Sequence, residues 1–264
     1  MEANDLRLLS RALYMQEVTV DLKLKGKVAL VTGAGSQIGY GRAIAVTLAE
    51  EGCDVVVADL NPEWAEQTAA EIEKMGCKTM AVKVDVADRV EVDAMVQAAI
   101  EKFGRIDILV NNAGTSSKEK PFMEMNKADW DLDVSVNLYG QMNVAQAVVP
   151  HMARQKYGRI VNTSGGQGIP TISVYGAAKA GVEAFTHALA LEVAPLGIVV
   201  NGISPGLGDT NLTKRNTREF MEGNRQMSAL KRLCTPQDVA PAVAFLASDL
   251  CSYMVGQWLR LGTS

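Results

Sequence analysis

The sequence predicts a single-domain α/β fold, in which one doubly wound parallel sheet is covered by helices on both faces. From Gly26 onward, short β-branched runs alternate with longer helical patterns, and this alternation is typical of a parallel sheet. Most of the short runs are apolar at consecutive positions, as expected of strands that are buried on both sides. A length of 264 residues suits one large domain.

The expected strands and helix starts can be placed in chain order. The strand candidates are VALVT (28–32), DVVVA (54–58), KTMAVKV (78–84), IDILV (106–110), RIVNT (159–163) and IVVNGI (198–203). Helix N-caps are expected at Asn61 before Pro62, at Asp88 three residues before Glu91, and at Thr235 before Pro236. Residues 255–262 are expected to form a last strand at an edge of the sheet. The unpaired backbone groups of such an edge need to be covered.

Composition excludes several classes of function. The chain has 26 basic and 30 acidic side chains, so it offers no polycation for a nucleic acid or an anionic membrane. No apolar run reaches the ~18 residues that a membrane span needs. Residues 1–24 are expected to be an N-terminal extension to a domain at 25–264, and charged residues interrupt its leucines, so it contains no secretory core.

The four cysteines fit neither a disulfide framework nor a zinc site. Cys53, Cys77, Cys234 and Cys251 are far apart and form no CxxC pair. Small thiols of this kind are typical of a reducing compartment. We therefore expect a soluble, cytoplasmic protein without a metal.

A glycine-rich segment follows the first predicted strand and leads into a helix. Ligands of doubly wound sheets bind beyond the carboxyl ends of the strands. The segment at 33–41 reads GAGSQIGYG, and such turns let a pyrophosphate approach the backbone and the N-terminal amides of the next helix. A plain packing turn between strand and helix would also contain glycines, so the pattern alone is a weak indication of a nucleotide.

Asp59 strengthens the nucleotide interpretation. It ends the second predicted strand, some twenty residues past the glycine segment. A carboxylate at this point accepts both hydroxyls of an adenosine ribose and repels a 2′-phosphate. Leu60 and Asn61 follow it, so no Arg or Lys is placed there to bind that phosphate. The sequence therefore favours NAD over NADP as the cofactor.

Together with further motifs, these features resemble the short-chain dehydrogenase/reductase (SDR) family over roughly residues 25–262. The additional motifs are Asp85-Val86, Asn111-Asn112-Ala113-Gly114, Asn137, Tyr175-Gly176-Ala177-Ala178-Lys179, and Pro205-Gly206 followed by Thr210. Each motif is common alone, but their order and spacing are specific. The resemblance implies a Rossmann-like fold that binds a nicotinamide cofactor.

The resemblance also implies roles for individual residues. It assigns Asp85 and Val86 to the adenine, and Asn112, Ala113 and Gly114 to support of the sheet and cofactor. It places Pro205, Gly206 and Thr210 near the nicotinamide end, and gives Lys179 the nicotinamide ribose and Asn137 a relay water. The cofactor residues expected from the glycine segment are Gly33, Ser36, Gln37, Ile38 and Gly39.

Tyr175 and Lys179 predict acid/base chemistry. Their spacing of four residues puts both side chains on one face of a helix, one turn apart. An adjacent ammonium lowers the pKa of a phenol from its ordinary value near 10 by favouring the phenolate. Tyr175 is then suited to take the hydroxyl proton of a secondary alcohol, or to donate a proton to a carbonyl oxygen in the reverse direction.

The glycine segment departs from the family pattern. The usual loop is Thr-Gly, three residues, then Gly-x-Gly. Here Gln37 stands at the central glycine position, and Gly39-Tyr40-Gly41 follows two residues late. A two-residue insertion is the simplest explanation, and it changes the turn where the pyrophosphate is expected.

The serine region departs as well. The family has a second serine about thirteen residues before the tyrosine, and it polarises the substrate oxygen. In this chain Gly165, directly after Ser164, occupies the position of that second serine, and the stretch before Tyr175 is shorter than in the family. Ser164 is the candidate for the hydroxyl, with Gln167 and Ser173 as local substitutes. Loss of such a donor costs about 2.7–4 kcal/mol of transition-state stabilisation.

A substrate lid is expected at about residues 207–233. Its cations are Lys214, Arg215, Arg218, Arg225, Lys231 and Arg232. These cations would suit the phosphates of an acyl-CoA. The same residues are also typical of a solvated helix face, on which Glu219 and Glu222 would partly balance the charge.

Two functions remain open at this point. The first is an NAD-dependent oxidoreductase that interconverts a small-molecule secondary alcohol and a ketone, with a hydroxyacyl-CoA as one candidate substrate. Its catalytic residues would be Tyr175, Lys179, Asn137 and Ser164. The second is a catalytically degenerate SDR subunit that supports an active homologous partner. In either case the predicted edge strand needs covering, and the resemblance to the family implies that a dimer or tetramer covers it.

Overall fold

The computed structural model describes residues 20–214 and 217–262. Within them the expected doubly wound sheet is confirmed, with parallel strands in the order β3-β2-β1-β4-β5-β6-β7. The strands are β1 (Val28–Thr32), β2 (Asp54–Asp59), β3 (Thr79–Lys83), β4 (Ile108–Asn111), β5 (Gly158–Thr163), β6 (Ile198–Ser204) and β7 (Trp258–Arg260).

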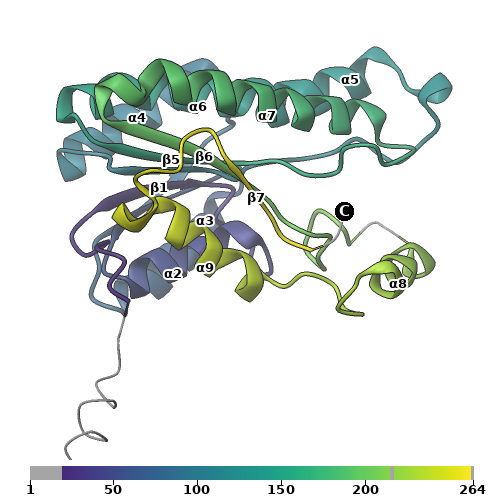
Figure 1. Cartoon of the computed structure of the whole chain (residues 1–264), viewed down its shortest axis with the longest axis horizontal. Helices are drawn as coiled ribbons and strands as arrows, with labels where there is room; N and C mark the ends of the chain where they lie inside the picture. Colours follow the sequence, from purple (N-terminus) through teal and green to yellow (C-terminus); the bar gives the residue numbers. More distant parts are fainter. Residues whose placement is uncertain (1–19, 215–216, 263–264) are drawn as a thin grey trace, which may run out of the picture.

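Helices cover both faces of this sheet (Figure 1). One layer contains α2 (Tyr40–Glu50), α3 (Pro62–Glu73) and α9 (Pro236–Ala247), and the other contains α4 (Arg89–Phe103), α6 (Gly140–Gln155) and α7 (Ser173–Val193). Neighbouring strand residues point to opposite layers. Val31 therefore packs in the cluster with α2 and α9, whereas Leu30 packs in the cluster with α4 and α6.

The remaining helices lie near the end of the sheet where the strands finish. α5 (Lys127–Val134) continues through a π-helical turn (Ser135–Tyr139) into α6. α8 (Arg218–Met227) lies apart from the two helix layers (Figure 1). Short 3₁₀ turns occupy Phe122–Glu124, Ala194–Leu196 and Asp249–Cys251.

The expected helix starts are confirmed by their hydrogen bonds. The side chain of Asn61 accepts from the backbone N–H of Trp64, and Asp88 accepts from Val90 and Glu91. Before α9, the carboxylate of Asp238 accepts from the backbone N–H of Thr235. These bonds satisfy amides that a helix start otherwise leaves without partners.

Some strand limits differ from the prediction because side chains capture backbone amides. β4 begins at Ile108, two residues later than expected. The N–H of Ile106 donates to the side chain of Gln155, whereas Asp107 still makes backbone bonds to Val28 and Arg159. β7 begins only at Trp258, because the N–H of Gln257 donates to Asn201 Oδ1. β7 is the edge strand that the sequence predicted, and it pairs with β6.

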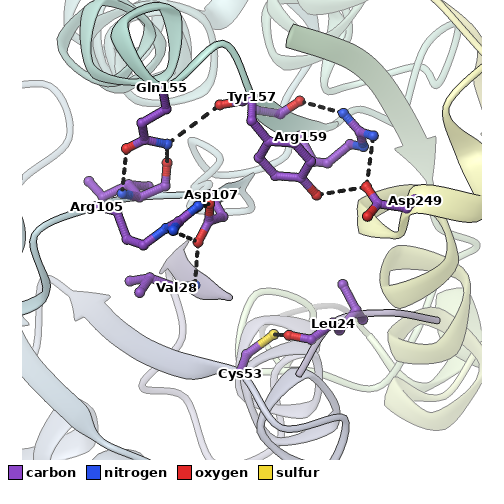
Figure 2. A network of polar contacts seen from close by, with 11 residues as sticks. Leu24, Val28, Cys53, Arg105, Asp107, Gln155, Tyr157, Arg159 and Asp249 are labelled. Carbon is purple, nitrogen blue, oxygen red and sulfur yellow. Dashed lines mark hydrogen bonds and ion pairs between the residues drawn. The ribbon is translucent and has the colours of Figure 1, made fainter. Parts of the chain in front are cut away.

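A polar network ties the amino ends of the strands together (Figure 2). The buried carboxylate of Asp107 accepts from the N–H of Val28 at 2.9 Å and from Arg105. At the start of β5, Arg159 and the preceding Tyr157 both donate to Asp249 Oδ1 at 2.9 Å. This end of the sheet is therefore cross-linked by charged groups.

The N-terminal extension falls largely outside the described residues, which begin at residue 20. Leu24, at its expected boundary, is buried in the core with Ala29 and Cys53. Across 20–214 and 217–262, the structure contains no helix that combines the length with the hydropathy needed to cross a bilayer.

Candidate active site

A cavity of about 1060 Å³ opens at the carboxyl ends of the strands. The segments that follow β1 to β6 all contribute to its wall, as expected for a doubly wound sheet. The structure brings most of the predicted residues together there: Gly33, Ser36, Gly39, Asp59, Asp85, Val86, Asn112, Ala113, Gly114, Ser164, Tyr175, Lys179, Pro205, Gly206 and Thr210.

Two of the predicted cofactor residues of the glycine segment lie elsewhere. Among the described residues, neither Gln37 nor Ile38 lines the cavity. The amide of Gln37 donates to Gly35 O at 2.8 Å, and Ile38 is 37% exposed. The segment forms a turn closed by Gly39 N donating to Ser36 O, and the two residues in the middle of this turn lie outside the cavity wall.

The start of α2 fits a pyrophosphate. Gly39 is the N-cap residue and makes no side-chain cap bond, so the first amides of α2 lack a side-chain acceptor. Gly39 and Gly41 line the cavity. A Cβ on Gly41 would lie 2.1 Å from Gly33 O, and only glycine allows the loop and helix to pack this closely. Helix starts of this kind bind anions.

Asp59 faces the same cavity at the end of β2. Its Oδ2 accepts from Gly35 N–H at 2.7 Å and its Oδ1 from Asn61 N–H at 3.0 Å. These bonds fix the carboxylate and leave it lone pairs for a ribose hydroxyl. Among the described lining residues, Lys179 is the one Lys or Arg, whereas Asp59, Glu63, Asp85 and Glu119 are acidic. A 2′-phosphate would therefore meet negative charge.

Tyr175 and Lys179 occupy successive turns of α7, as their spacing predicted. Lys179 Nζ lies 5.8 Å from the centroid of the Tyr175 ring and donates to Thr163 O at 3.1 Å. Lys179 is 2% exposed, and burial lowers its pKa to about 8. The ammonium is still the main form at neutral pH, and it stands beside the phenol.

Asn137 lies behind the described cavity wall, in the π-helical turn. Its Nδ2 donates to Thr115 O at 2.6 Å and to Asp133 O at 2.8 Å, and its Oδ1 accepts from Thr115 N–H. A Cβ on Gly114 would lie 3.0 Å from Asn137 Oδ1 and 3.5 Å from Lys179 Nζ. Asn137 and Lys179 therefore approach the same point, and the relay role of Asn137 remains a prediction.

Ser164 lines the cavity, but its hydroxyl is engaged in the protein. Its Oγ donates to Lys179 O at 2.9 Å and accepts from Gln167 Nε2 at 2.6 Å. Gln167 and Ser173, the proposed substitutes, are absent from the described cavity wall. Ser173 instead contacts Met125 Sδ at 3.8 Å.

Gly165 has a backbone conformation that serine rarely adopts. Its φ is +129°, although a Cβ would find its nearest atoms, Pro205 O and Ser204 Oγ, only at 3.7 Å. The backbone at this position therefore has a conformation that depends on glycine. The segment departs from the family pattern in its backbone as well as in its missing hydroxyl.

Several predicted lid cations are bound by neighbouring groups. Arg225 pairs with Glu222 at 2.6 Å, Arg232 donates to Asp238 at 2.8 Å, and Lys231 Nζ donates to a backbone carbonyl. Arg215 lies outside the described residues. The segment at 207–233 instead contributes apolar side chains to the cavity, notably Phe220.

Sequence reasoning missed part of the wall. Tyr40 lines the cavity, and its hydroxyl donates to Gly206 O at 2.9 Å. Asn211 donates to Ser36 Oγ at 2.8 Å, so two bonds join the glycine segment to the segment after β6. The position of Tyr40 between two loop glycines was the one available signal. Further apolar lining residues are Leu132, Val136, Ile169, Ile172 and Leu212.

Comparisons with known proteins agree with this geometry. A family model described as enoyl-(acyl carrier protein) reductase matches residues 33–261. A 3-oxoacyl-[acyl-carrier-protein] reductase from Thermotoga maritima is 38% identical over 239 residues, which cover 89% of this chain and 96% of the relative. The (2S)-[(R)-hydroxy(phenyl)methyl]succinyl-CoA dehydrogenase subunit BbsD from Thauera aromatica is 37% identical over 241 residues, 89% of this chain and 95% of the relative.

Solved structures show the same architecture. A 7α-hydroxysteroid dehydrogenase complexed with NADH and a 7-oxo bile acid superposes with a TM-score of 0.86 at 33% identity, covering 91% of this chain and 94% of the other. Carveol dehydrogenase from Mycobacterium avium in complex with NAD has a TM-score of 0.85 at 29% identity, covering 90% and 96%. The chain therefore belongs to the short-chain dehydrogenase/reductase family, as an oxidoreductase of the dehydrogenase/ketoreductase type.

Proposed function

We propose that this chain is an NAD-dependent enzyme that interconverts a secondary alcohol and a ketone, with Tyr175 as the acid/base. The observation that carries the proposal is the placement of Tyr175 and Lys179 in one cavity with Asp59 and the uncapped start of α2. A dinucleotide that spans this cavity would have its ribose at Asp59 and its nicotinamide end near Lys179.

NAD is favoured by the charges along the cavity. Two of the related structures are complexes with NADH and with NAD, which supports a nicotinamide cofactor here. The fixed carboxylate of Asp59, and the lack of a cation near it in the described wall, support NAD over NADP. The proposed contacts of Asp85, Val86, Pro205, Gly206 and Thr210 are consistent with their places in that wall.

The protein's own part in the reaction is a proton transfer. When bound, the nicotinamide supplies or accepts the hydride. Tyr175 then donates a proton to the carbonyl oxygen of a ketone, or takes one from the hydroxyl of an alcohol. The Lys179 ammonium favours the phenolate by a Coulomb interaction that is strengthened by burial. In this proposal Asn137 holds a water that connects Lys179 to solvent.

The hydroxyl of Ser164 can donate to the substrate oxygen only after it gives up its hydrogen bond to Lys179 O. A missing donor at this position costs about 2.7–4 kcal/mol, which corresponds to a factor of hundreds in rate. We therefore expect slow turnover compared with an enzyme that retains the serine.

The cavity wall indicates the chemistry of the substrate. The part of the wall contributed by the loop before α7, by α5 and by the lid is largely apolar, with Leu132, Ile172 and Phe220, so the ketone should carry apolar groups. A hydroxyacyl-CoA is supported by the name of BbsD. Lys214 and Arg218 are exposed in the lid segment and are the candidates for its phosphates.

A degenerate subunit is the second candidate function. Gly165 with its positive φ, the inserted turn at Gln37 and the engaged hydroxyl of Ser164 favour it. BbsD is itself named as a subunit. The edge strand β7 supplies a surface for a dimer or tetramer, either with a second copy or with a homologous SDR partner.

Titration of the purified chain with NAD and NADP, followed by assays on a panel of ketones and alcohols, tests both candidates. The proposed enzyme binds NAD more tightly than NADP and turns over at least one apolar ketone. If the chain binds neither nucleotide, or shows no turnover until a homologous SDR is added, the subunit candidate replaces the enzyme. The cytoplasmic location expected from the sequence stays a prediction.

A further inference from the structure

We propose that Gln167, Glu183 and Arg260 form a clamp that positions the loop at residues 164–168 against Tyr175, because this chain lacks the usual serine segment of the family. This inference rests on the proposed function, since it assigns these three side chains to the positioning of its acid/base.

The loop touches the tyrosine directly. A Cβ on Gly166 would lie 2.7 Å from Tyr175 Cε1, and a Cβ on Gly176 would lie 2.9 Å from Gly166 O. The backbone of Gly166 therefore lies against the ring and against the first turn of α7. Any shift of this loop changes the space that the phenol occupies.

The loop's own backbone does little to fix that position. Gly165, Gly166 and Gly168 all have positive φ. Glycine has the widest choice of backbone conformations and loses the most entropy when it is ordered. A segment with this composition needs anchors outside itself to hold one conformation.

Gln167 provides the first anchor. Its Nε2 donates to Ser164 Oγ at 2.6 Å and to Glu183 Oε1 at 2.7 Å, so both amide hydrogens have acceptors. Ser164 in turn donates to Lys179 O at 2.9 Å. Tyr175, Lys179 and Glu183 occupy successive turns of α7, and the loop is bonded or packed to all three.

Arg260 of β7 provides the second anchor. Its Nη1 and Nη2 donate to Glu183 Oε1 and Oε2 at 3.0 and 2.9 Å, in a bidentate pair. The pKa of Glu183 is held below its ordinary range by Arg260, so the carboxylate remains an acceptor for Gln167. A half-exposed pair adds little stability by itself, but its geometry aims Glu183 at the loop.

Three substitutions test the clamp: two should lower kcat strongly, and the third is a conservative variant of one of them. Gln167→Leu removes both donors, and Glu183→Leu removes the acceptor. Each should lower kcat on the order of 10- to 100-fold, because small misplacements of an acid/base have effects of this size. Glu183→Gln keeps one oxygen that accepts from Gln167 Nε2 and Arg260 Nη1 but loses the acceptor for Arg260 Nη2, so its loss of kcat should be clearly smaller than that of Glu183→Leu. The cofactor Kd should not change in any variant.

The matched control is Arg89→Gln, which breaks a half-exposed pair with Asp93 in α4 and should leave kcat unchanged. If the wild type is active and Gln167→Leu and Glu183→Leu keep its kcat, the clamp is refuted while the proposed function stands. Equal losses in Glu183→Gln and Glu183→Leu also refute it.

If the wild type has no turnover, the proposed function fails, and hydrogen exchange decides the clamp. The N–H of Ser164 donates to Ile203 O at 2.9 Å and serves as a protected reporter. Faster exchange in peptides covering 164–168 of Gln167→Leu supports the clamp, and unchanged exchange overturns it.

Discussion

The ammonium of Lys179 is 2% exposed and donates to a backbone carbonyl, Thr163 O, beside the Tyr175 ring. Burial lowers its pKa from 10.5 to about 8. The unfolded chain therefore binds this proton more tightly, and stability contributed by this site rises as the pH increases from about 8 to 10.5. Below pH 8 the buried side chain is charged, and the whole desolvation penalty lowers the free energy of unfolding. Lys179 therefore destabilises the fold at neutral pH, which is consistent with a role in catalysis.

Lys179→Met should raise the free energy of unfolding at pH 7, by up to about 3 kcal/mol, because it removes a buried charge. The difference from the wild type should shrink between pH 8 and 10.5. Urea unfolding at several pH values measures this, with turnover abolished throughout. A variant less stable than the wild type at pH 7 would show that the ammonium is well compensated.

Asp59 should control the choice of cofactor. Asp59→Ala should weaken discrimination against NADP by about tenfold, or 1.4 kcal/mol, because the 2′-phosphate no longer faces a carboxylate. Asp59→Asn should do the same while keeping an acceptor for Gly35 N–H. Kd values for both nucleotides give the result, with Glu119→Gln as a control for a different acid of the cavity wall. A wild type that prefers NADP contradicts the assignment.

At the scale of elements, the loop between β5 and α7 is built on glycine conformations. Gly165→Ser restores the residue type of the family, but φ is +129° there, where side chains are strained by about 1–3 kcal/mol. We expect a loss of stability and no gain in kcat, measured by thermal unfolding and turnover. A substantial increase in kcat would mean that the loop readily adopts the usual serine conformation. Gly223→Ala in α8, where a Cβ meets nothing within 4 Å, is the control.

Elements with a local cause were predictable from the sequence. Consecutive apolar residues marked β1, β2 and β6, and Asn61 and Asp88 marked helix starts through bonds to nearby amides. Site residues were predictable where their spacing in the sequence determines their relative position, as for Tyr175 and Lys179 on one face of a helix. Contacts between distant segments were not predictable, because nothing in a local pattern reports them. The bond from Tyr40 to Gly206, which are 166 residues apart, is one example.

Over the whole molecule, the two ends of the sheet serve different purposes. The carboxyl ends surround the cavity, whereas the amino ends carry the network of Asp107, Arg159 and Asp249 (Figure 2). Arg159 is 6% exposed and donates to Gly158 O, Ser248 O and Asp249. It joins β5 to the turn that follows α9, far from the proposed chemistry.

Arg159→Leu should therefore lower stability without affecting catalysis. We expect a loss of about 1–3 kcal/mol, less than for a fully buried pair because Asp249 is partly exposed. Chemical unfolding and kcat, measured on the same preparation, separate the two effects. A fall in kcat at temperatures where the variant is fully folded would show that the two ends of the sheet are coupled.

The central claim is that Tyr175 transfers the proton. The most direct measurement compares the rate of NADH formation or consumption by the wild type and by Tyr175→Phe, at saturating cofactor. We predict that the variant loses turnover by ~10²–10⁴-fold while its Kd for NAD stays within several fold. A Tyr175→Phe enzyme that turns over at the wild-type rate would contradict this role.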